Sequence, residues 1–295
     1  MIRLLQTGLH HSNGFVRKGC ILALQGPKRW AALRADPQAF FDAPPVIANS
    51  FPKSGTHLLD QLVAGLPGRA NFGEFISSMT SSFQMREMSV ESACQRLRRI
   101  VPGELVRAHL FHDDRYAAEL TAKNAVHFFI FRDPRDVIVS DCHYLRDINR
   151  WHRLHPHFRA CANMEEAILL SIRGMRRQDP SVPLPDVAAR FAAYEGWLHD
   201  PTALAVRFED LRGANQAEHV ARMVDFFAAR CEQPLDRAAT VAAMLAQVDP
   251  AKSHTFRQGG KGGWAAAFTP TCKDAFKEVA GDLLVRLGYE TGDAW

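Results

Sequence analysis

One short segment of the chain combines a basic residue, two hydroxyls and a glycine in an order that suits the binding of an anion. The segment is Pro52-Lys-Ser-Gly-Thr56, between a short apolar run and a helix-like stretch. In such a strand–turn–helix connection the backbone N–H groups at the helix start converge, and the helix dipole favours a negative charge there. Lys53 adds a full positive charge, and Gly55 lets the backbone come close to a ligand. The pattern favours a phosphate cradle; a capped helix with an exposed lysine is the other interpretation.

The same segment lacks the usual motif for binding a nucleoside triphosphate. A Walker A loop reads Gly-x-x-x-x-Gly-Lys-Ser/Thr, whereas here Lys53 comes before Ser54 and Gly55, and no glycine lies in residues 46–52. The ligand is therefore expected to be phosphate-like without being held as in a kinase. A P-loop-type nucleotide or small-molecule kinase, which would need Mg²⁺ and a nucleoside triphosphate, is the alternative enzyme class.

A second segment, Phe128–Ser140, again runs from a strand to a helix through a turn that contains proline. Arg132 lies at the expected end of the strand, and Ser140 follows eight residues later, two turns into the helix. An arginine offers a bidentate fork and a serine a neutral donor, so both side chains could bind one phosphate. The alternative is a surface network among the charged residues of the turn, which are Arg132, Asp133, Arg135 and Asp136.

A third segment, Phe256–Trp264, is rich in glycine. Its glycines and Arg257 make a loop with many backbone donors, which could wrap around an anion. A flexible linker has the same composition, but Trp264 and Phe268 argue for a loop held on the core.

Together these segments resemble the sulfotransferases that use 3′-phosphoadenosine 5′-phosphosulfate (PAPS). Residues 52–56 look like the family's 5′-phosphosulfate loop, PKSGTTW, and the spacing of Arg132 and Ser140 is similar to its 3′-phosphate motif. A fourth segment, Val106-Arg-Ala-His-Leu110, resembles the family's Lys-Thr-His-Leu segment. The resemblance covers residues 45–290. The C-terminal signature RKGxxGDW…FT is matched at Arg257, Gly259, Gly262, Trp264, Phe268 and Thr269.

The resemblance implies an enzyme that moves the sulfuryl group of PAPS, in line, to a hydroxyl or amine of a small-molecule or glycan acceptor. The product of the donor is adenosine 3′,5′-bisphosphate (PAP), and no metal is required. Lys53 would stabilise the leaving phosphate and His109, with an ordinary pKa of about 6.5, would act as the general base. Arg107 takes the place of the family's lysine. The residues implied to bind the donor are Lys53, Ser54, Gly55, Thr56, His57, Arg132, Ser140, Phe208, Arg257, Gln258 and Gly259.

The sequence departs from the family pattern at several positions, among them Gly263, which replaces the aspartate of the C-terminal signature. His57 replaces the second threonine of PKSGTTW, and Leu58 replaces the tryptophan that stacks on adenine. The usual Tyr-Glu-Asp segment begins with Phe208, which can stack but cannot donate a hydrogen bond, and Gln258 replaces a lysine. These changes affect the adenine contacts more than the phosphate contacts.

Short apolar runs and helical stretches alternate along the chain, which predicts βαβ units. The expected fold is α/β, with three layers and a central, mostly parallel β-sheet flanked by helices, as in P-loop NTPases. Residues 1–44 are predicted as a basic, helical N-terminal extension and residues 45–295 as a single sulfotransferase domain. The predicted strands are Val46–Asn49, Leu105–His109, Val126–Phe131 and Leu204–Phe208. The predicted helices are Ser54–Leu66, Pro134–Ile148, Met164–Arg176, Asp186–Leu198, Gln216–Arg230, Leu235–Gln247 and Cys272–Leu287.

The basic character of the chain is concentrated near its beginning. The 295 residues have a formal net charge of +4, but the first 35 positions hold six basic residues and no acidic one. A nucleic-acid-binding protein more often spreads its basic residues over a face with aromatic neighbours, so no nucleic-acid partner is expected. The first 35 residues fit a pair of packing helices or an element that rests on an anionic membrane. A non-catalytic anion- or membrane-binding protein is thus a further functional alternative.

Cysteine usage and hydropathy indicate a reduced, cytoplasmic protein. The six cysteines are scattered without a C-x-x-C pair, and no apolar run approaches the length of a membrane span. The family's C-terminal dimer pattern is largely absent, so no oligomeric state is predicted.

A dense group of basic residues follows the second anion segment. This group predicts either a wall over an anionic or aromatic acceptor or a solvated basic loop. A metal site has less support, because no cysteine or acidic residue lies at a recognised spacing. The residues are His143, Arg146, Arg150, His152, Arg153, His155, His157 and Arg159.

Overall fold

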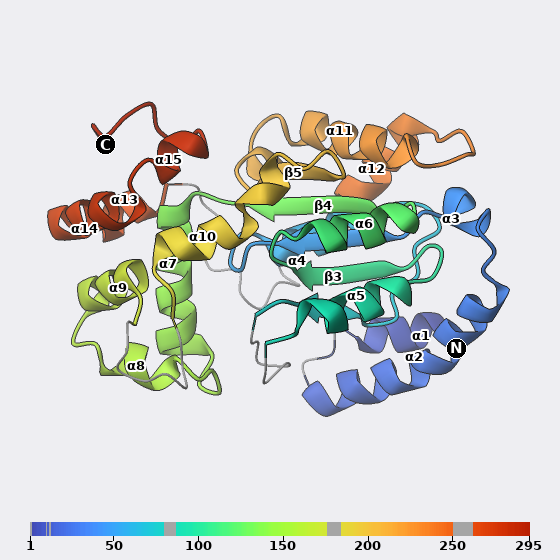
Figure 1. Ribbon diagram of the computed structural model, residues 1–295, viewed down its shortest axis with the longest axis horizontal. Coiled ribbons are helices and arrows are strands. Elements are labelled where there is room, and N and C mark those ends of the chain that lie inside the picture. The colour runs from blue at the N-terminus through green and yellow to red at the C-terminus, as the bar shows by residue number, and fades with distance from the viewer. Residues whose placement is uncertain (1, 10, 12, 80–86, 176–183, 250–261) are drawn as a thin grey trace.

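A five-stranded parallel β-sheet forms the centre of the structure (Figure 1). The computed structural model describes residues 2–9, 11, 13–79, 87–175, 184–249 and 262–295. The strand order is β2-β3-β1-β4-β5, with every neighbouring pair parallel. The strands are β1 (Val46–Ser50), β2 (Phe75–Ser77), β3 (Leu105–His109), β4 (Val126–Phe131) and β5 (Ala203–Arg207).

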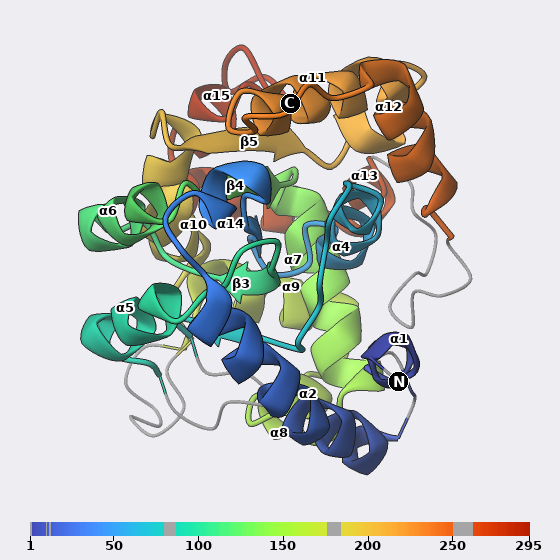
Figure 2. The ribbon, with the colours of Figure 1, turned by 90° about the vertical axis from the view of Figure 1, so that its right-hand side faces the viewer.

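Helices cover both faces of the sheet, because the side chains of a strand alternate between two apolar layers. In β4, Phe128 and Ile130 belong to one core cluster, whereas Phe129 and Phe131 belong to the other. Figure 2, which views the sheet along its strands, shows a helical layer on each side, so the predicted three-layer α/β fold is confirmed. The first layer is α4 (Thr56–Ala64), α11 (Gln216–Ala228) and α12 (Arg237–Ala246), and the second includes α5 (Val90–Arg98), α6 (Asp114–Ala122) and α10 (Val187–Glu195).

The remaining helices lie before β1, after β4 and at the end of the chain. In Figure 1, the group around α7 stands beyond the carboxyl ends of the strands, where the arrowheads point. Before β1 come α1 (Ile2–Gly8), α2 (Gly14–Arg34) and α3 (Ala39–Asp42). After β4 come α7 (Pro134–His143), the π-helical turn η1 (Tyr144–Ile148), α8 (His155–Ala160) and α9 (Met164–Arg173). The 3₁₀ turns η2 (Gly196–Leu198) and η3 (Asp210–Arg212) flank β5, and α13 (Trp264–Ala267), α14 (Pro270–Ala280) and α15 (Leu283–Arg286) complete the chain.

All four strands predicted from the sequence are present. β3 and β4 have the predicted bounds, β1 extends one residue further to Ser50, and β5 begins and ends one residue earlier than predicted. Phe208 therefore lies just after a strand rather than at its end. The edge strand β2 has no predicted counterpart, because its three residues do not form a detectable apolar run.

Several predicted helices are shorter than expected or divided. The helix predicted at Pro134–Ile148 is α-helical only to His143 and then widens into η1. The helix predicted at Cys272–Leu287 is split into α14 and α15, because Gly281 has a φ of +54° and ends α14. The helices α3, α5, α6, α8 and α13 have no predicted counterpart.

The N-terminal segment forms the helices α1 and α2, which pack on the sheet domain through a small apolar cluster. Leu9 and Leu24 belong to this cluster together with Phe72 and Val101 of the domain. The boundary predicted at residue 44 stays a prediction. In the described part of the chain, no helix is both long and apolar enough to cross a membrane.

A buried ion pair also fixes α2 to the sheet domain. Lys28 Nζ lies 2.6 Å from Glu104 Oε1 and 3.1 Å from Glu74 Oε2. Glu104 is fully buried just before β3, and its other oxygen accepts a hydrogen bond from the Val101 N–H at 3.0 Å. Burial raises the pKa of the Glu104 carboxyl, and the charge of Lys28 opposes that shift. The ammonium group of Lys28 is thus the counter-ion that allows Glu104 to be charged in the interior.

We expect Lys28→Ala to lower the free energy of unfolding by about 3 kcal/mol, because it leaves a buried carboxylate without its counter-ion. Lys18→Ala, which removes an exposed lysine from the same helix, is the control and should change it by less than about 0.5 kcal/mol. Chemical denaturation of both variants measures the difference. Equal effects would show that this ion pair does not anchor α2.

Candidate active site

The loop after β1 has the geometry of an anion cradle. It leads into α4 through two residues with positive φ, Lys53 at +67° and Gly55 at +99°. The Ser54 N–H donates to the carbonyl of Phe51 at 3.1 Å, which closes the turn. The Ser54 hydroxyl is buried and has no hydrogen-bond partner among the described residues. A buried, unsatisfied hydroxyl at the start of a helix is suited to pair with an anionic ligand.

The absence of a side chain at Gly55 is required by the ring of Phe208 as well as by the backbone. A Cβ at this position would lie 2.5 Å from Phe208 Cδ2 and 3.2 Å from Ile130 Cδ1. The Phe208 N–H donates to the carbonyl of Phe131 at 2.8 Å, and the guanidinium carbon of Arg132 is 4.5 Å from the centre of the Phe208 ring. The buried Phe208 ring therefore contacts both predicted phosphate segments. Its stacking on adenine stays a prediction.

Lys53 lies in a partly buried position against an aromatic ring. Its Nζ is 3.9 Å from the centre of the Tyr144 ring, at the start of η1. Burial lowers the pKa of Lys53 to about 8, with Asp141 opposing the shift and Arg132 adding to it. The lysine is therefore charged at neutral pH and loses its charge in mildly alkaline solution. Sequence patterns do not point to Tyr144 or Asp141, because both are far from Lys53 along the chain.

His109 ends β3 beside Ser50, the last residue of β1. Its Nδ1 is 2.7 Å from the Ser50 carbonyl oxygen and 3.1 Å from the Ser50 hydroxyl. A carbonyl oxygen only accepts, so this contact assigns the proton to Nδ1 and leaves the lone pair on Nε2. The Ser50 hydroxyl also lies 2.7 Å from Thr56 Oγ1. Ser50, which no motif singles out, thus joins the predicted base to the predicted cradle.

The pKa of His109 differs from the value expected for the residue type. Burial lowers it to about 4; the hydrogen bond to Ser50 opposes this shift, and the charges of Arg107 and His57 add to it. The expected value of about 6.5 is therefore wrong for this site, because desolvation outweighs the hydrogen bond. His109 is neutral over the physiological pH range, which keeps Nε2 able to accept a proton.

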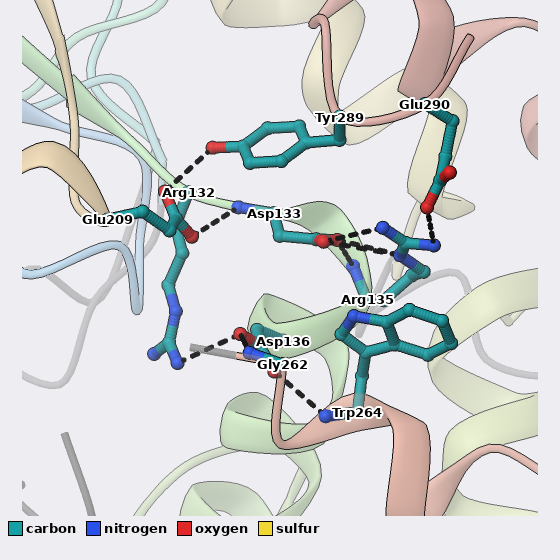
Figure 3. Close-up of polar contacts among 9 residues, drawn as sticks. All are labelled: Arg132, Asp133, Arg135, Asp136, Glu209, Gly262, Trp264, Tyr289 and Glu290. Carbon is teal, nitrogen blue, oxygen red and sulfur yellow. Dashed lines mark hydrogen bonds and ion pairs between the residues drawn. The ribbon is translucent and has the colours of Figure 1, made fainter. Parts of the chain in front are cut away.

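Charge pairs hold the turn between β4 and α7 (Figure 3). Arg132 Nη2 lies 3.3 Å from Asp136 Oδ2, while Arg135 pairs with Asp133 at 2.7 Å and with Glu290 at 2.6 Å. Asp133 also caps α7 by accepting a hydrogen bond from the Arg135 N–H. The surface network considered as an alternative is wrong for Asp133 and Arg135, because both side chains are buried.

Asp136 connects the C-terminal segment to the same turn. Its Oδ2 accepts from the Gly262 N–H at 3.0 Å and its Oδ1 from the Trp264 N–H at 2.9 Å. The Trp264 ring lies 3.8 Å from the guanidinium carbon of Arg135. The described end of the glycine-rich segment is therefore attached to the turn that carries Arg132. The donor contacts predicted for this segment stay predictions, because the residues lie outside the described part of the chain: Arg257, Gln258 and Gly259.

Glu209, the residue after Phe208, attaches the end of β5 to this turn. One oxygen of Glu209 accepts from the Asp133 N–H at 3.1 Å, and the other accepts from the Tyr289 hydroxyl at 2.9 Å (Figure 3). Burial raises the pKa of Glu209, and its hydrogen bonds and the charge of Arg132 oppose that shift. These contacts hold the Phe208 ring in place between Gly55 and Arg132.

Three other predicted site residues lie on the elements that form the site: β3, α4 and α7. Arg107 is two residues before His109 on β3, and its Nη1 is 4.0 Å from Asp60 Oδ2 of α4. Ser140 is half-buried two turns into α7, and His57 is exposed in the first turn of α4. The roles predicted for Arg107, Ser140 and His57 stay predictions.

The basic residues after α7 line a cavity of their own. Its volume is about 460 Å³, and none of the predicted donor-binding or catalytic residues lines it. Its lining includes the acidic Asp147, which is 3.2 Å from His143 Nδ1. Across the described residues, no group of three or more His, Cys, Asp or Glu side chains is arranged to hold a metal ion. The lining residues are Arg146, Asp147, Arg150, His155 and Arg159.

We expect Gly55→Ala to weaken the binding of PAP at least about tenfold, because the new Cβ must displace the Phe208 ring and the backbone is already at positive φ. Gly68→Ala is the matched control, since Gly68 also has a positive φ (+72°) but its Cβ would meet nothing within 4 Å. That control should lower the free energy of unfolding by about 1 kcal/mol and leave the affinity for PAP unchanged. Isothermal titration calorimetry measures both affinities. An unchanged affinity for PAP in Gly55→Ala would contradict the assignment of the loop after β1 as the anion cradle.

Solved structures with a similar fold include sulfotransferases that hold PAP. The mouse sulfotransferase SULT7A1 complexed with PAP aligns with a TM-score of 0.55 and 18% identity, covering 86% of this chain and 87% of that one. Retinol dehydratase with androsterone and the inactive cofactor PAP aligns with a TM-score of 0.52 and 16% identity, covering 83% of each chain. Retinol dehydratase with retinol and PAP has the same score and identity, with 88% of this chain and 86% of that one covered.

These solved structures are at most 18% identical to this chain, so they establish only its fold. Membership of a family is established by the sequence. No curated protein matches the sequence in a direct comparison. The family model of the sulfotransferase domain, however, matches residues 43–288. Since this match takes in the sheet, the cradle, His109 and the turn after β4, the chain belongs to the sulfotransferase domain family of enzymes, as its motifs predict.

Proposed function

We propose that this sulfotransferase moves the sulfuryl group of PAPS to an acceptor hydroxyl, with His109 as the general base and Lys53 at the leaving phosphate. The contact between His109 Nδ1 and the Ser50 carbonyl carries the proposal, because it leaves an unprotonated Nε2 next to the strand that enters the cradle. The similar solved structures contain PAP, which supports PAPS as the donor.

The residues at the carboxyl edge of the sheet fit such a donor. The unsatisfied Ser54 hydroxyl and the backbone N–H groups at the start of α4 suit oxygens of the 5′-phosphosulfate. Arg132 and Ser140 on the next connection suit the 3′-phosphate. Leu58 is buried in the core, so it does not take over the adenine stacking of the tryptophan found there in the family.

In the proposed step the acceptor loses a proton to His109, while negative charge develops on the leaving phosphate. The acceptor oxygen forms a bond to sulfur while the bond from sulfur to the bridging phosphate oxygen breaks. His109 Nε2 takes the proton of the acceptor hydroxyl, and PAP leaves with the negative charge that develops on the bridging oxygen. The ammonium group of Lys53 and the backbone N–H groups at the start of α4 stabilise that charge.

The acceptor is proposed to be a small molecule that carries an alcohol. Retinol dehydratase binds androsterone or retinol, and this supports a small hydroxyl compound for the present chain. An amine or a glycan would use the same base and the same leaving phosphate, so an acceptor screen with labelled PAPS must include all three classes.

We expect His109→Ala to lower kcat by about 10²- to 10⁴-fold, because the acceptor proton then has no base. Binding of PAP should stay close to the value of the unaltered protein, since His109 is not placed on a phosphate. His199→Ala, which removes an exposed histidine, is the control. Steady-state transfer from labelled PAPS and calorimetry with PAP give the two readouts.

Normal turnover in His109→Ala would refute the base assignment. Stabilisation of the unaltered protein by Mg-ATP but not by PAP would refute the donor assignment instead and would indicate a kinase.

We expect kcat/KM to depend on pH through two groups that act in opposite directions. Activity should rise as the pH rises through about 4, where His109 becomes neutral, and should fall as the pH rises through about 8, where Lys53 loses its proton. Lys53→Arg keeps the positive charge, so its residual activity should lack the alkaline fall. A pH profile with an acid limb near 6.5 would contradict the lowered pKa of His109.

A further inference from the structure

The helix α2 carries apolar side chains on two opposite sides. On the inner side, Leu24 is fully buried against the sheet domain, and Lys28, one turn later, reaches Glu104. On the outer side, Phe15, Leu22 and Leu33 are 85%, 73% and 85% exposed. A helix that only packs on a domain needs one apolar side, so the outer residues need a separate explanation.

The outer side chains Phe15, Leu22 and Leu33 lie on one side of the helix, and we call them the apolar stripe. Phe15 and Leu22 are seven residues apart and Leu22 and Leu33 eleven, which are close to two and three whole turns of an α-helix. Trp30, 58% exposed, lies one turn before Leu33. Leu4 of the neighbouring α1 is 77% exposed as well. Figures 1 and 2 show α2 along the outside of the molecule, and the large exposed fractions of these side chains show that no described element covers them.

Exposed apolar residues are concentrated in this part of the structure. Of the large apolar side chains that are exposed among the described residues, those beyond residue 41 are only Ile148, Trp151 and Val285. Single exposed residues are normal on a protein surface, whereas a contiguous apolar patch marks an interaction site.

Two basic residues lie within the stripe. Lys18 and Arg29 are exposed; Lys18 is one turn before Leu22, and Arg29 is two turns after Leu22 and one turn before Leu33. The guanidinium carbon of Arg34 is 3.9 Å from the centre of the Trp30 ring. The first 35 positions hold no acidic residue. The partner should therefore be apolar inside and negatively charged at its surface.

We infer that α2 rests in the plane of an anionic membrane surface, with its apolar stripe in the acyl region and its basic residues at the lipid headgroups. Exposed apolar side chains on one side of a helix, with Lys and Arg among them and a tryptophan beside them, have the chemistry of an interfacial helix. A second copy of this chain fits less well, because two such faces would bring like charges together. The Lys28–Glu104 pair fixes the inner side of α2 to the sheet domain, so the opposite side, with the stripe, faces outward. This inference does not depend on the proposed reaction.

Flotation with lipid vesicles tests the inference on the full chain. The protein should float with vesicles of phosphatidylcholine and phosphatidylglycerol and much less with vesicles of pure phosphatidylcholine, and added salt should weaken the binding. Phe15→Ser combined with Leu33→Ser should reduce the bound fraction at least about tenfold, since both side chains leave the acyl region. Lys18→Glu combined with Arg29→Glu should do the same. Trp151→Ser, which removes a 94% exposed tryptophan elsewhere, should have no effect.

Three outcomes would overturn the inference. The first is a lack of binding to the anionic vesicles, and the second is equal binding by the Phe15/Leu33 variant and the unaltered protein. The third is a dimer, found by sedimentation velocity without lipid, that Phe15→Ser with Leu33→Ser dissociates, because the stripe would then be a contact between copies. Circular dichroism of each variant ensures that a loss of binding is not a loss of fold.

Discussion

The candidate active site depends on the pairing of β1 with β3 on one side and with β4 on the other. Val46 is in register with Leu105 and with Val126, and Ser50 is in register with Ile130. Because the three strands are parallel, their carboxyl ends lie at one edge of the sheet. The cradle, His109 and Arg132 reach that edge from parts of the chain that are distant in sequence. Ligands of open α/β sheets bind at this edge, where connections leave the sheet in opposite directions.

The turn after β4 organises the second half of the site through charge rather than apolar packing. Asp136 accepts two backbone N–H groups from the C-terminal segment and pairs with Arg132. Each carboxylate of the turn therefore has defined partners in the interior, where an unpaired one would be costly. Arg132, which we propose binds the 3′-phosphate, and the described end of the C-terminal segment are thus positioned by the same carboxylate.

The parts of the fold that sequence predicts well are those with local causes. β3 and β4 are buried on both faces, so they read as apolar runs with sharp ends, and the cradle has a motif of its own. The edge strand β2 is too short to leave such a run. The contact of Lys53 with the Tyr144 ring could not be predicted, because it arises from tertiary packing between the loop after β1 and the start of η1. The low pKa of His109 has the same origin, since burial depends on neighbours that the motif does not contain.

The hydrogen bond between His109 and Ser50 is made to a main-chain carbonyl, and this bears on how the enzyme can change over evolution. In many catalytic sites a carboxylate side chain orients the histidine, so one substitution removes the orienting group. Here every residue type at position 50 would supply the same carbonyl oxygen, provided that β1 and β3 stay paired. The tautomer of His109 therefore depends on the pairing of the strands rather than on the side chain at position 50.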